Sequence, residues 1–270
     1  MITLLGVCKS FDGGRTQAVD HVDLEVPKGG FLAIVGESGS GKSTLVKIIN
    51  RLVEPDAGSV EIEGGPVGKE PAHLLRRRIG YVFQAVGLFP HLSVAENIGV
   101  TPRLLGWAPA RIAGRVEELL DLVRLPRAYG GRRPDALSGG QRQRVGIARA
   151  LAAEPAIVLL DEAFGALDPI TRTSLGDDYR RLHDHLGLTT VMITHDVAEA
   201  VLLADRIAVM KTGRLLAVGS PDELSTENVD TYVRELMDTP RRQAERLAAR
   251  LDGKGSREHG LREHGLGGGA

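Results

Sequence analysis

Eight consecutive residues have the types and spacing needed to hold a phosphate group. Residues 36–43 read GESGSGKS and fit the pattern G-x-x-x-x-G-K-[ST]. Glycines let backbone N–H groups curl around phosphate oxygens, and a helix that starts there adds the positive end of its dipole. Lys42 supplies a positive charge to the β- and γ-phosphates, and Ser43 offers its hydroxyl to Mg²⁺. A glycine-rich turn that binds no ligand would not need this lysine or this serine, so the pattern predicts a nucleotide site. The residues expected to bind the nucleotide here are Gly36, Ser38, Gly39, Ser40, Gly41, Lys42, Ser43 and Thr44.

Two carboxylates follow an apolar run later in the chain. Residues 157–160 read IVLL, and Asp161 and Glu162 come directly after them. Ligands of an open α/β sheet bind beyond the carboxyl ends of its strands, so we expect this pair beside the phosphate loop. Asp161 is placed to hold Mg²⁺ through a water molecule. Glu162 is placed to orient or deprotonate the water that attacks the phosphate. Acidic residues also cap helices at such positions, but beside a phosphate loop the pair predicts hydrolysis.

A second stretch of small residues precedes a helical pattern. Residues 137–141 read LSGGQ, and a helix is expected from residue 141 onward. The backbone donors and the serine hydroxyl of this stretch form a second anion-binding edge. One domain with two such edges suggests that the second edge serves the nucleotide of another subunit.

Four continuous apolar runs predict strands that are buried on both faces. They cover residues 31–35, 157–160, 190–193 and 207–210. Helical patterns lie between them, and this alternation predicts an α/β fold with a mostly parallel sheet covered on both faces. The expected helices cover residues 44–52, 111–123, 141–153 and 170–186.

Two further regions depart from this alternation. Residues 22–26 and 60–63 alternate apolar and polar side chains, which is typical of half-buried antiparallel strands. Residues 92–153 are mostly helical and are interpreted as an inserted helical subdomain. The expected architecture therefore combines a parallel sheet, an antiparallel β subdomain and a helical insert.

Composition restricts the environment in which we expect the chain to work. The 270 residues carry a formal net charge of -1, which disfavours a nucleic-acid partner. The single cysteine, Cys8, fits a reducing compartment, and its simplest interpretation is a small core residue. No apolar run approaches the roughly 18–20 residues that span a bilayer, and the first residues lack the pattern of a signal peptide. We therefore expect a cytoplasmic protein that reaches a membrane only through partner subunits.

The last part of the chain changes in composition. Residues 238–270 are basic and rich in glycine, and they contain the repeat REHGL at 257–261 and 262–266. Such a segment buries little apolar surface, so we expect it to be disordered, although residues 241–251 have the composition of a basic helix.

Taken together, the motifs resemble the nucleotide-binding domains of ABC transporters over residues 1–237. In that family the phosphate loop is the Walker A motif, residues 157–161 are Walker B, and Glu162 is the catalytic glutamate. The resemblance implies that Phe11 stacks on adenine, that Gln84 senses Mg²⁺ or the attacking water, and that His195 contacts the γ-phosphate. Taken singly, that phenylalanine and that histidine would be read as structural residues. The signature motif and the loop after Walker B add Ser138, Gly139, Gly140, Gln141 and Asp168 to the nucleotide site.

The resemblance also implies how the chain works and with which partners. It implies a P-loop NTPase (RecA-like) core, with ATP and Mg²⁺ as ligands. Two copies would face each other head to tail, so that each ATP lies between the Lys42 loop of one copy and residues 138–141 of the other. Residues 84–105 would contact transmembrane permease subunits, with an apolar stretch at 87–90 that a buried loop would also explain. An extracytoplasmic substrate-binding protein would take part indirectly, and the chain would lie on the inner face of the cell membrane.

The cargo is indicated by resemblance alone. Residues 50–55, 76–81, 87–91 and 162–172 look like those of importers for glycine betaine, choline and related osmoprotectants. Ala163 departs from the proline common in relatives, and the C-terminal CBS domains of many relatives are not in this sequence. Importers of other small solutes therefore stay open as an alternative. Soluble ABC ATPases that act on nucleic acid or ribosomes are a further alternative, disfavoured because the chain has one copy of the motifs and no long basic insertion.

Overall fold

The larger of two sheets forms the centre of the molecule. The computed structural model describes residues 1–165, 167–226 and 229–259, with side chains up to Arg250. Five of the strands in this sheet run parallel and one edge strand is antiparallel, in the order β10-β9-β3-β8-β7-β6. The predicted buried strands are confirmed. The strands are β3 (Phe31–Val35), β6 (Ile79–Val82), β7 (Ile157–Asp161), β8 (Thr189–Ile193), β9 (Arg206–Lys211) and β10 (Arg214–Gly219).

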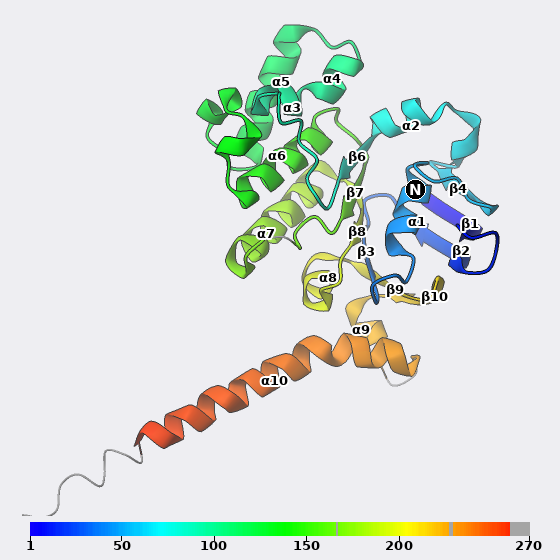
Figure 1. Cartoon of the computed structure of the whole chain (residues 1–270), viewed down its shortest axis with the longest axis vertical. Coiled ribbons are helices and arrows are strands. Elements are labelled where there is room, and N and C mark those ends of the chain that lie inside the picture. The colour runs from blue at the N-terminus through cyan, green and yellow to red at the C-terminus, as the bar shows by residue number, and fades with distance from the viewer. Residues whose placement is uncertain (166, 227–228, 260–270) are drawn as a thin grey trace, which may run out of the picture.

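A smaller antiparallel sheet packs beside the first, as the alternating patterns predict. Its strand order is β2-β1-β4-β5, and Figure 1 shows this sheet next to α1 and close to the N-terminus. Its strands are β1 (Ile2–Ser10), β2 (Gln17–Val26), β4 (Ala57–Ile62) and β5 (Gly65–Pro66). β1 pairs with both β2 and β4, so it is one of the two inner strands of this sheet.

The central sheet separates two hydrophobic clusters, and β3 contributes to both. Phe31, Ala33 and Val35 belong to the cluster shared with the helical insert, while Leu32 and Ile34 belong to the cluster shared with the antiparallel sheet. Alternate side chains of a strand point to opposite faces, so a strand between two apolar layers must be apolar throughout. This explains why β3 has no polar residue.

Helices cover both faces of the central sheet. The helical insert is confirmed: α3 to α6 lie between β6 and β7 in the chain, and Figure 1 shows them together at one end of the molecule. Two of the longer helices start at caps, because Ser138 accepts a hydrogen bond at the start of α6 and Asp168 at the start of α7. The helices are α1 (Lys42–Ile49), α2 (Ala72–Arg78), α3 (Val94–Ile98), α4 (Val100–Leu104), α5 (Pro109–Leu122), α6 (Gly139–Leu151), α7 (Pro169–Leu186), α8 (Val197–Leu203), α9 (Pro221–Leu224) and α10 (Thr231–His259). Short 3₁₀ turns are η1 (Val67–Lys69), η2 (Arg127–Gly131) and η3 (Pro134–Ala136).

The C-terminal segment differs from the expectation. Disorder was expected from residue 238 onward, but α10 continues through Pro240 to His259 and extends away from the body of the molecule (Figure 1). The predicted basic helix at 241–251 is confirmed. Helix-forming Ala, Arg, Leu and Glu residues dominate this stretch, and Arg241 pairs with Glu245 one turn later at 2.9 Å. Residues 260–270, which include the whole of the second REHGL repeat, lie outside the described residues.

None of the helices that the structure describes has the length and apolar composition needed to cross a bilayer.

Candidate active site

The phosphate loop lies between the end of β3 and the start of α1, and close packing fixes its shape. Gly36 and Gly41 have φ angles of +147° and +100°, a region that side chains disfavour. A Cβ on Gly36 would lie 2.0 Å from the carbonyl oxygen of Met210, and one on Gly41 would lie 2.1 Å from that of Ala18. The loop is therefore held between β9 and β2, and its glycines leave no room for a side chain.

The amine of Lys42 lies inside the curve of this loop. It donates hydrogen bonds to the carbonyl oxygens of Gly36 at 2.8 Å and Glu37 at 2.7 Å, and the residue is 6% exposed. Burial lowers the pKa of this amine, while the carboxylates of Glu162 and Asp161 act in the opposite direction. The loop thus places a positive charge where phosphate oxygens would bind.

Asp161 ends β7 directly beside the loop. Its Oδ1 accepts a hydrogen bond from Ser43 Oγ at 3.3 Å, and its Oδ2 accepts one from the hydroxyl of Tyr81 at 3.0 Å. Tyr81 lies on the neighbouring strand β6, and burial raises the pKa of its hydroxyl, which therefore stays a donor. The adjacent hydroxyl and carboxylate oxygens are the kind of ligands that Mg²⁺ prefers, so the residues present fit this ion.

Three segments meet at Glu162. Gln84 Nε2 donates to Glu162 Oε2 at 2.6 Å, and His195 Nδ1 lies 3.9 Å from the same oxygen. The backbone of Glu162 is left-handed, with φ of +47°, and its N–H donates to the carbonyl oxygen of Ile193 at the end of β8. A non-glycine residue in this conformation carries strain, and such strain is concentrated at functional sites. The structure therefore brings together Gln84, Glu162 and His195, as the motifs predict.

A hollow of about 190 Å³ lies above the phosphate loop, with Glu162 at its edge. Its walls are Ala18, residues 38–44 and Glu162. Residues 138–141 are not among them. Instead Ser138 Oγ accepts from the N–H of Gln141 at 3.3 Å, and Gln141 Oε1 accepts from the N–H of Ser138 at 3.0 Å. The signature motif thus caps its own helix, and in one copy of the chain it does not wall the hollow.

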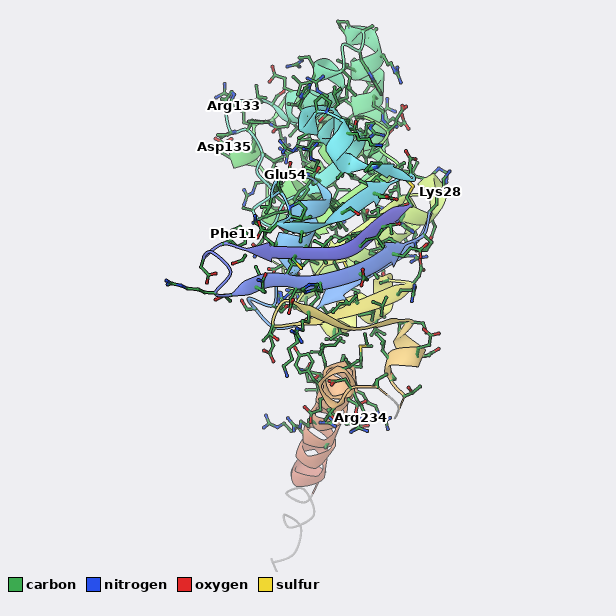
Figure 2. The ribbon with its side chains drawn as sticks, turned by 90° about the vertical axis from the view of Figure 1, so that its right-hand side faces the viewer. Phe11, Lys28, Glu54, Arg133, Asp135 and Arg234 are labelled. Carbon is green, nitrogen blue, oxygen red and sulfur yellow. The ribbon has the colours of Figure 1, made fainter. Side chains whose placement is uncertain are left out.

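Phe11 and Asp168 also lie apart from the hollow. Phe11 is 67% exposed at the outer end of β1, as Figure 2 shows, with Lys9 Nζ at 5.6 Å from its ring centroid. Asp168 caps α7 by accepting from the N–H of Thr171 at 3.0 Å, and hydrogen bonds from Thr171 lower the pKa of its carboxyl. Both positions are accessible to a ligand or to a partner.

Two residues of the site escape motif analysis. Tyr81 is one, and its only signal is a hydroxyl in an otherwise apolar strand. Arg172 is the other: its guanidinium donates to the carbonyl oxygens of Gly165 at 3.1 Å and Leu167 at 3.0 Å, and to Asp196 Oδ2 at 3.4 Å. It therefore ties the loop after Glu162 to the residue after His195.

A parallel sheet with a phosphate loop at its carboxyl edge and two acidic residues beside that loop defines a nucleotide-binding α/β domain. A family model described as ABC transporter matches residues 19–165. The chain belongs to this ABC transporter family.

Several characterised relatives are similar over most of the chain. The choline transport ATP-binding protein OpuBA of Bacillus subtilis (strain 168) is 47% identical over 237 residues, which cover 88% of this chain and 62% of the relative. The glycine betaine uptake system ATP-binding protein YehX of Escherichia coli (strain K12) is 46% identical, covering 87% and 76%. The sulfate/thiosulfate import ATP-binding protein CysA of Caulobacter vibrioides is 49% identical, covering 83% and 66%. The chain thus spans less than two thirds of the length of the first of these relatives.

A solved structure is similar in fold and in sequence. It is a dimeric ATP-binding cassette in a post-hydrolysis state bound to ADP and Pi, 34% identical to this chain, with a TM-score of 0.74. The match covers 82% of this chain and 98% of that one.

The packing of the loop leads to a first prediction. Gly41→Ala should strongly weaken ATP binding, because its new Cβ meets the carbonyl oxygen of Ala18 and the loop must move. Gly64→Ala is a matched control, since Gly64 also has a positive φ of +77°, a Cβ there meets nothing within 4 Å, and it lies between β4 and β5 outside the walls of the hollow. The control should cost about 1–2 kcal/mol of folding free energy and keep the loop in place. Fluorescent-nucleotide titration and urea unfolding measure both effects, and equal losses of affinity would contradict the packing argument.

Proposed function

We propose that the chain is the ATP-binding and ATP-hydrolysing subunit of an ABC importer. The observation that carries this proposal is the convergence of Lys42, Ser43 and Glu162 around one hollow. Asp161 is hydrogen-bonded to Ser43, and Gln84 is hydrogen-bonded to Glu162. Membership of the ABC transporter family and the likeness to an ADP-bound cassette support the same conclusion.

Each residue of the site has a defined task in this proposal. Lys42 and the N–H groups of the loop neutralise the phosphates of ATP, and Thr44 extends this cradle into the first turn of α1. Ser43 and, through water, Asp161 would hold Mg²⁺, which would supply positive charge to the phosphate oxygens. Tyr81 fixes the orientation of the Asp161 carboxylate.

Glu162 and its neighbours are assigned the activation of the water that attacks the γ-phosphate. Glu162 accepts the proton of the attacking water, with its carboxylate oriented by Gln84 at 2.6 Å. His195 stands next to the same carboxylate and contacts the γ-phosphate. Arg172 donates hydrogen bonds to both loops that carry these groups and so fixes their relative position.

A second copy of the chain completes the site. The hollow lacks residues 138–141, and the similar solved cassette is a dimer. We assign Ser138, Gly139, Gly140 and Gln141 to the nucleotide of the partner copy, with Asp168 at the interface between copies and Phe11 against adenine. Permease subunits dock near residues 84–105, where Phe89, Leu104 and Leu105 are exposed. An extracytoplasmic binding protein delivers the solute, and the chain lies on the inner face of the cell membrane.

The solute is assigned by likeness to relatives. Transport proteins for choline and for glycine betaine are 46–47% identical to the chain, so we propose a quaternary-amine osmoprotectant as cargo. A small anion is the alternative, because a sulfate/thiosulfate import protein is 49% identical.

Replacing the proposed general base separates binding from hydrolysis. Glu162→Gln should retain ATP binding and reduce hydrolysis by roughly 10²–10⁴-fold, because the amide cannot accept the proton of water. The ATP-bound variant should also elute as a stable dimer in size-exclusion chromatography with light scattering. Lys42→Ala is the contrasting variant, expected to lose ATP affinity. Hydrolysis at the wild-type rate in Glu162→Gln would refute the assignment.

Mixed dimers test whether each site is shared between copies. A Lys42→Ala chain paired with a Ser138→Arg chain places both changes in one site and leaves the other intact, so about half of the ATPase activity should remain. A chain that carries both changes, paired with the wild type, damages both sites and should be inactive. Differently tagged copies allow these dimers to be purified. Equal activity in the two mixed dimers would show that the sites are not shared.

The cargo is tested with the complete transporter. In liposomes that contain the chain with its own permease and receptor, receptor loaded with glycine betaine or choline should stimulate ATP hydrolysis, and sulfate should not. Stimulation by sulfate alone would favour the small-anion importer. Co-purification of ribosomes or DNA in place of a permease would refute the importer.

A further inference from the structure

An irregularity between β1 and β2 brings three metal-ligating side chains together on the outer part of the antiparallel sheet. Val7 pairs with Val22 and Lys9 pairs with Val19, so one residue of β1, Cys8, lies opposite two residues of β2, Asp20 and His21. This is a β-bulge, and His21 has the left-handed φ of +49° that such a bend produces.

The bulge changes where the side chains of β2 point. Val19 and Val22 both enter the hydrophobic cluster, although they are three positions apart in a strand. The two residues between them therefore both point away from that cluster: Asp20 is half-buried and His21 is exposed. Figure 2 views the antiparallel sheet from its outer side, with β1 and β2 at the front.

We propose that Cys8, Asp20 and His21 bind a thiophilic divalent cation of the zinc class. One ligating atom from each residue lies within 4.8 Å of the other two. Ligands of a tetrahedral zinc ion lie roughly 3.3–3.7 Å apart, so small side-chain rotations bring the three atoms to bonding positions. A thiolate, an imidazole and a carboxylate form a donor set that zinc accepts and that Mg²⁺ does not prefer.

The surroundings of the three residues support a site with one open position. Cys8 is only 8% exposed, and its Sγ accepts a hydrogen bond from the N–H of His21 at 3.3 Å. The imidazole of His21 is exposed, which gives an ion and a coordinating water access from solvent.

Asp20 uses its two oxygens in different directions. Oδ1 lies 2.7 Å from His21 Nδ1, and Oδ2 accepts from Arg214 Nε at 2.6 Å. Oδ1 is thus the oxygen available to an ion, while Arg214 fixes the orientation of the carboxylate from outside. Outer partners of this kind raise metal affinity by orienting the ligand, although the positive charge of Arg214 opposes the cation. We therefore expect the thiolate and the imidazole to contribute most of the affinity for the ion.

The site lies two backbone hydrogen bonds from the phosphate loop. The N–H of Asp20 donates to the carbonyl oxygen of Gly213 at 2.8 Å, and the N–H of Gly213 donates to that of Ser40 at 3.1 Å. None of the three proposed ligands walls the nucleotide hollow. The proposal is therefore independent of the proposed ATPase function and can be tested without nucleotide.

Titration of the chelator-treated full-length chain with Co²⁺ tests the site directly. A thiolate ligand produces a sulfur-to-cobalt charge-transfer band, which binding at the oxygen ligands Ser43 and Asp161 cannot produce. We expect one equivalent of Co²⁺ with this band, and its displacement by one equivalent of Zn²⁺. Absence of the band in the wild-type protein would overturn the proposal.

Variants test each ligand. Cys8→Ala should abolish the band, and His21→Asn should weaken Zn²⁺ binding at least about tenfold, whereas His73→Asn, an exposed histidine on α2, should leave it unchanged. Asp20→Asn should weaken it less than His21→Asn. Urea unfolding of the metal-free variants identifies any that fail to fold, and Zn²⁺ should raise the unfolding midpoint of the wild type but not of Cys8→Ala. An unchanged band and affinity in both His21→Asn and Asp20→Asn would show that the thiol acts alone and would overturn the three-residue site.

Discussion

The close approach of three backbone segments at the phosphate loop is the constraint on which the rest of the structure depends. The carbonyl oxygens of Ala18 on β2 and Met210 on β9 occupy the space that side chains at Gly41 and Gly36 would need. The loop is thereby fixed to the antiparallel sheet on one side and to the central sheet on the other. A loop held in this way keeps its N–H groups and Lys42 in position before any phosphate arrives, so binding need not pay for ordering them.

The order of the strands then decides which side chains meet at this loop. β3 is flanked by β8, β8 by β7 and β7 by β6, and all four run parallel. Their carboxyl ends lead into Lys42, His195, the pair Asp161 and Glu162, and Gln84. Four segments far apart in the sequence reach one edge of the sheet for this reason. The left-handed backbone of Glu162, which costs about 1–3 kcal/mol, is offset in part by its hydrogen bond to Ile193.

Sequence patterns predict the parts of this arrangement that are governed by local rules. Continuous apolar runs identified the buried strands because a strand between two apolar layers has no polar face, and the phosphate loop is recognisable because its chemistry needs fixed residues at fixed spacing. The hydrogen bond from Tyr81 to Asp161 and the bonds of Arg172 join residues that only the tertiary fold brings together. The bulge at His21 depends on the register of β1 against β2, which no local pattern records. The helix beyond residue 238 differs from the prediction because the glycines near the end of the sequence indicate disorder, whereas the residues at 241–251 favour a helix.

Helix α6 connects the signature motif to the segment that follows Gln84. Its first turn is the signature motif, capped by Ser138, and near its last turn Arg149 donates to the carbonyl oxygens of Val86 and Gly87 at 2.6 Å. Those carbonyls follow Gln84, whose side chain holds Glu162. Arg144, at the middle of α6, donates to the buried carboxylate of Asp178 on α7 at 3.0 Å. The segment that contains residues 84–87 is therefore bonded both to the helix that begins at Ser138 and, through the side chain of Gln84, to Glu162.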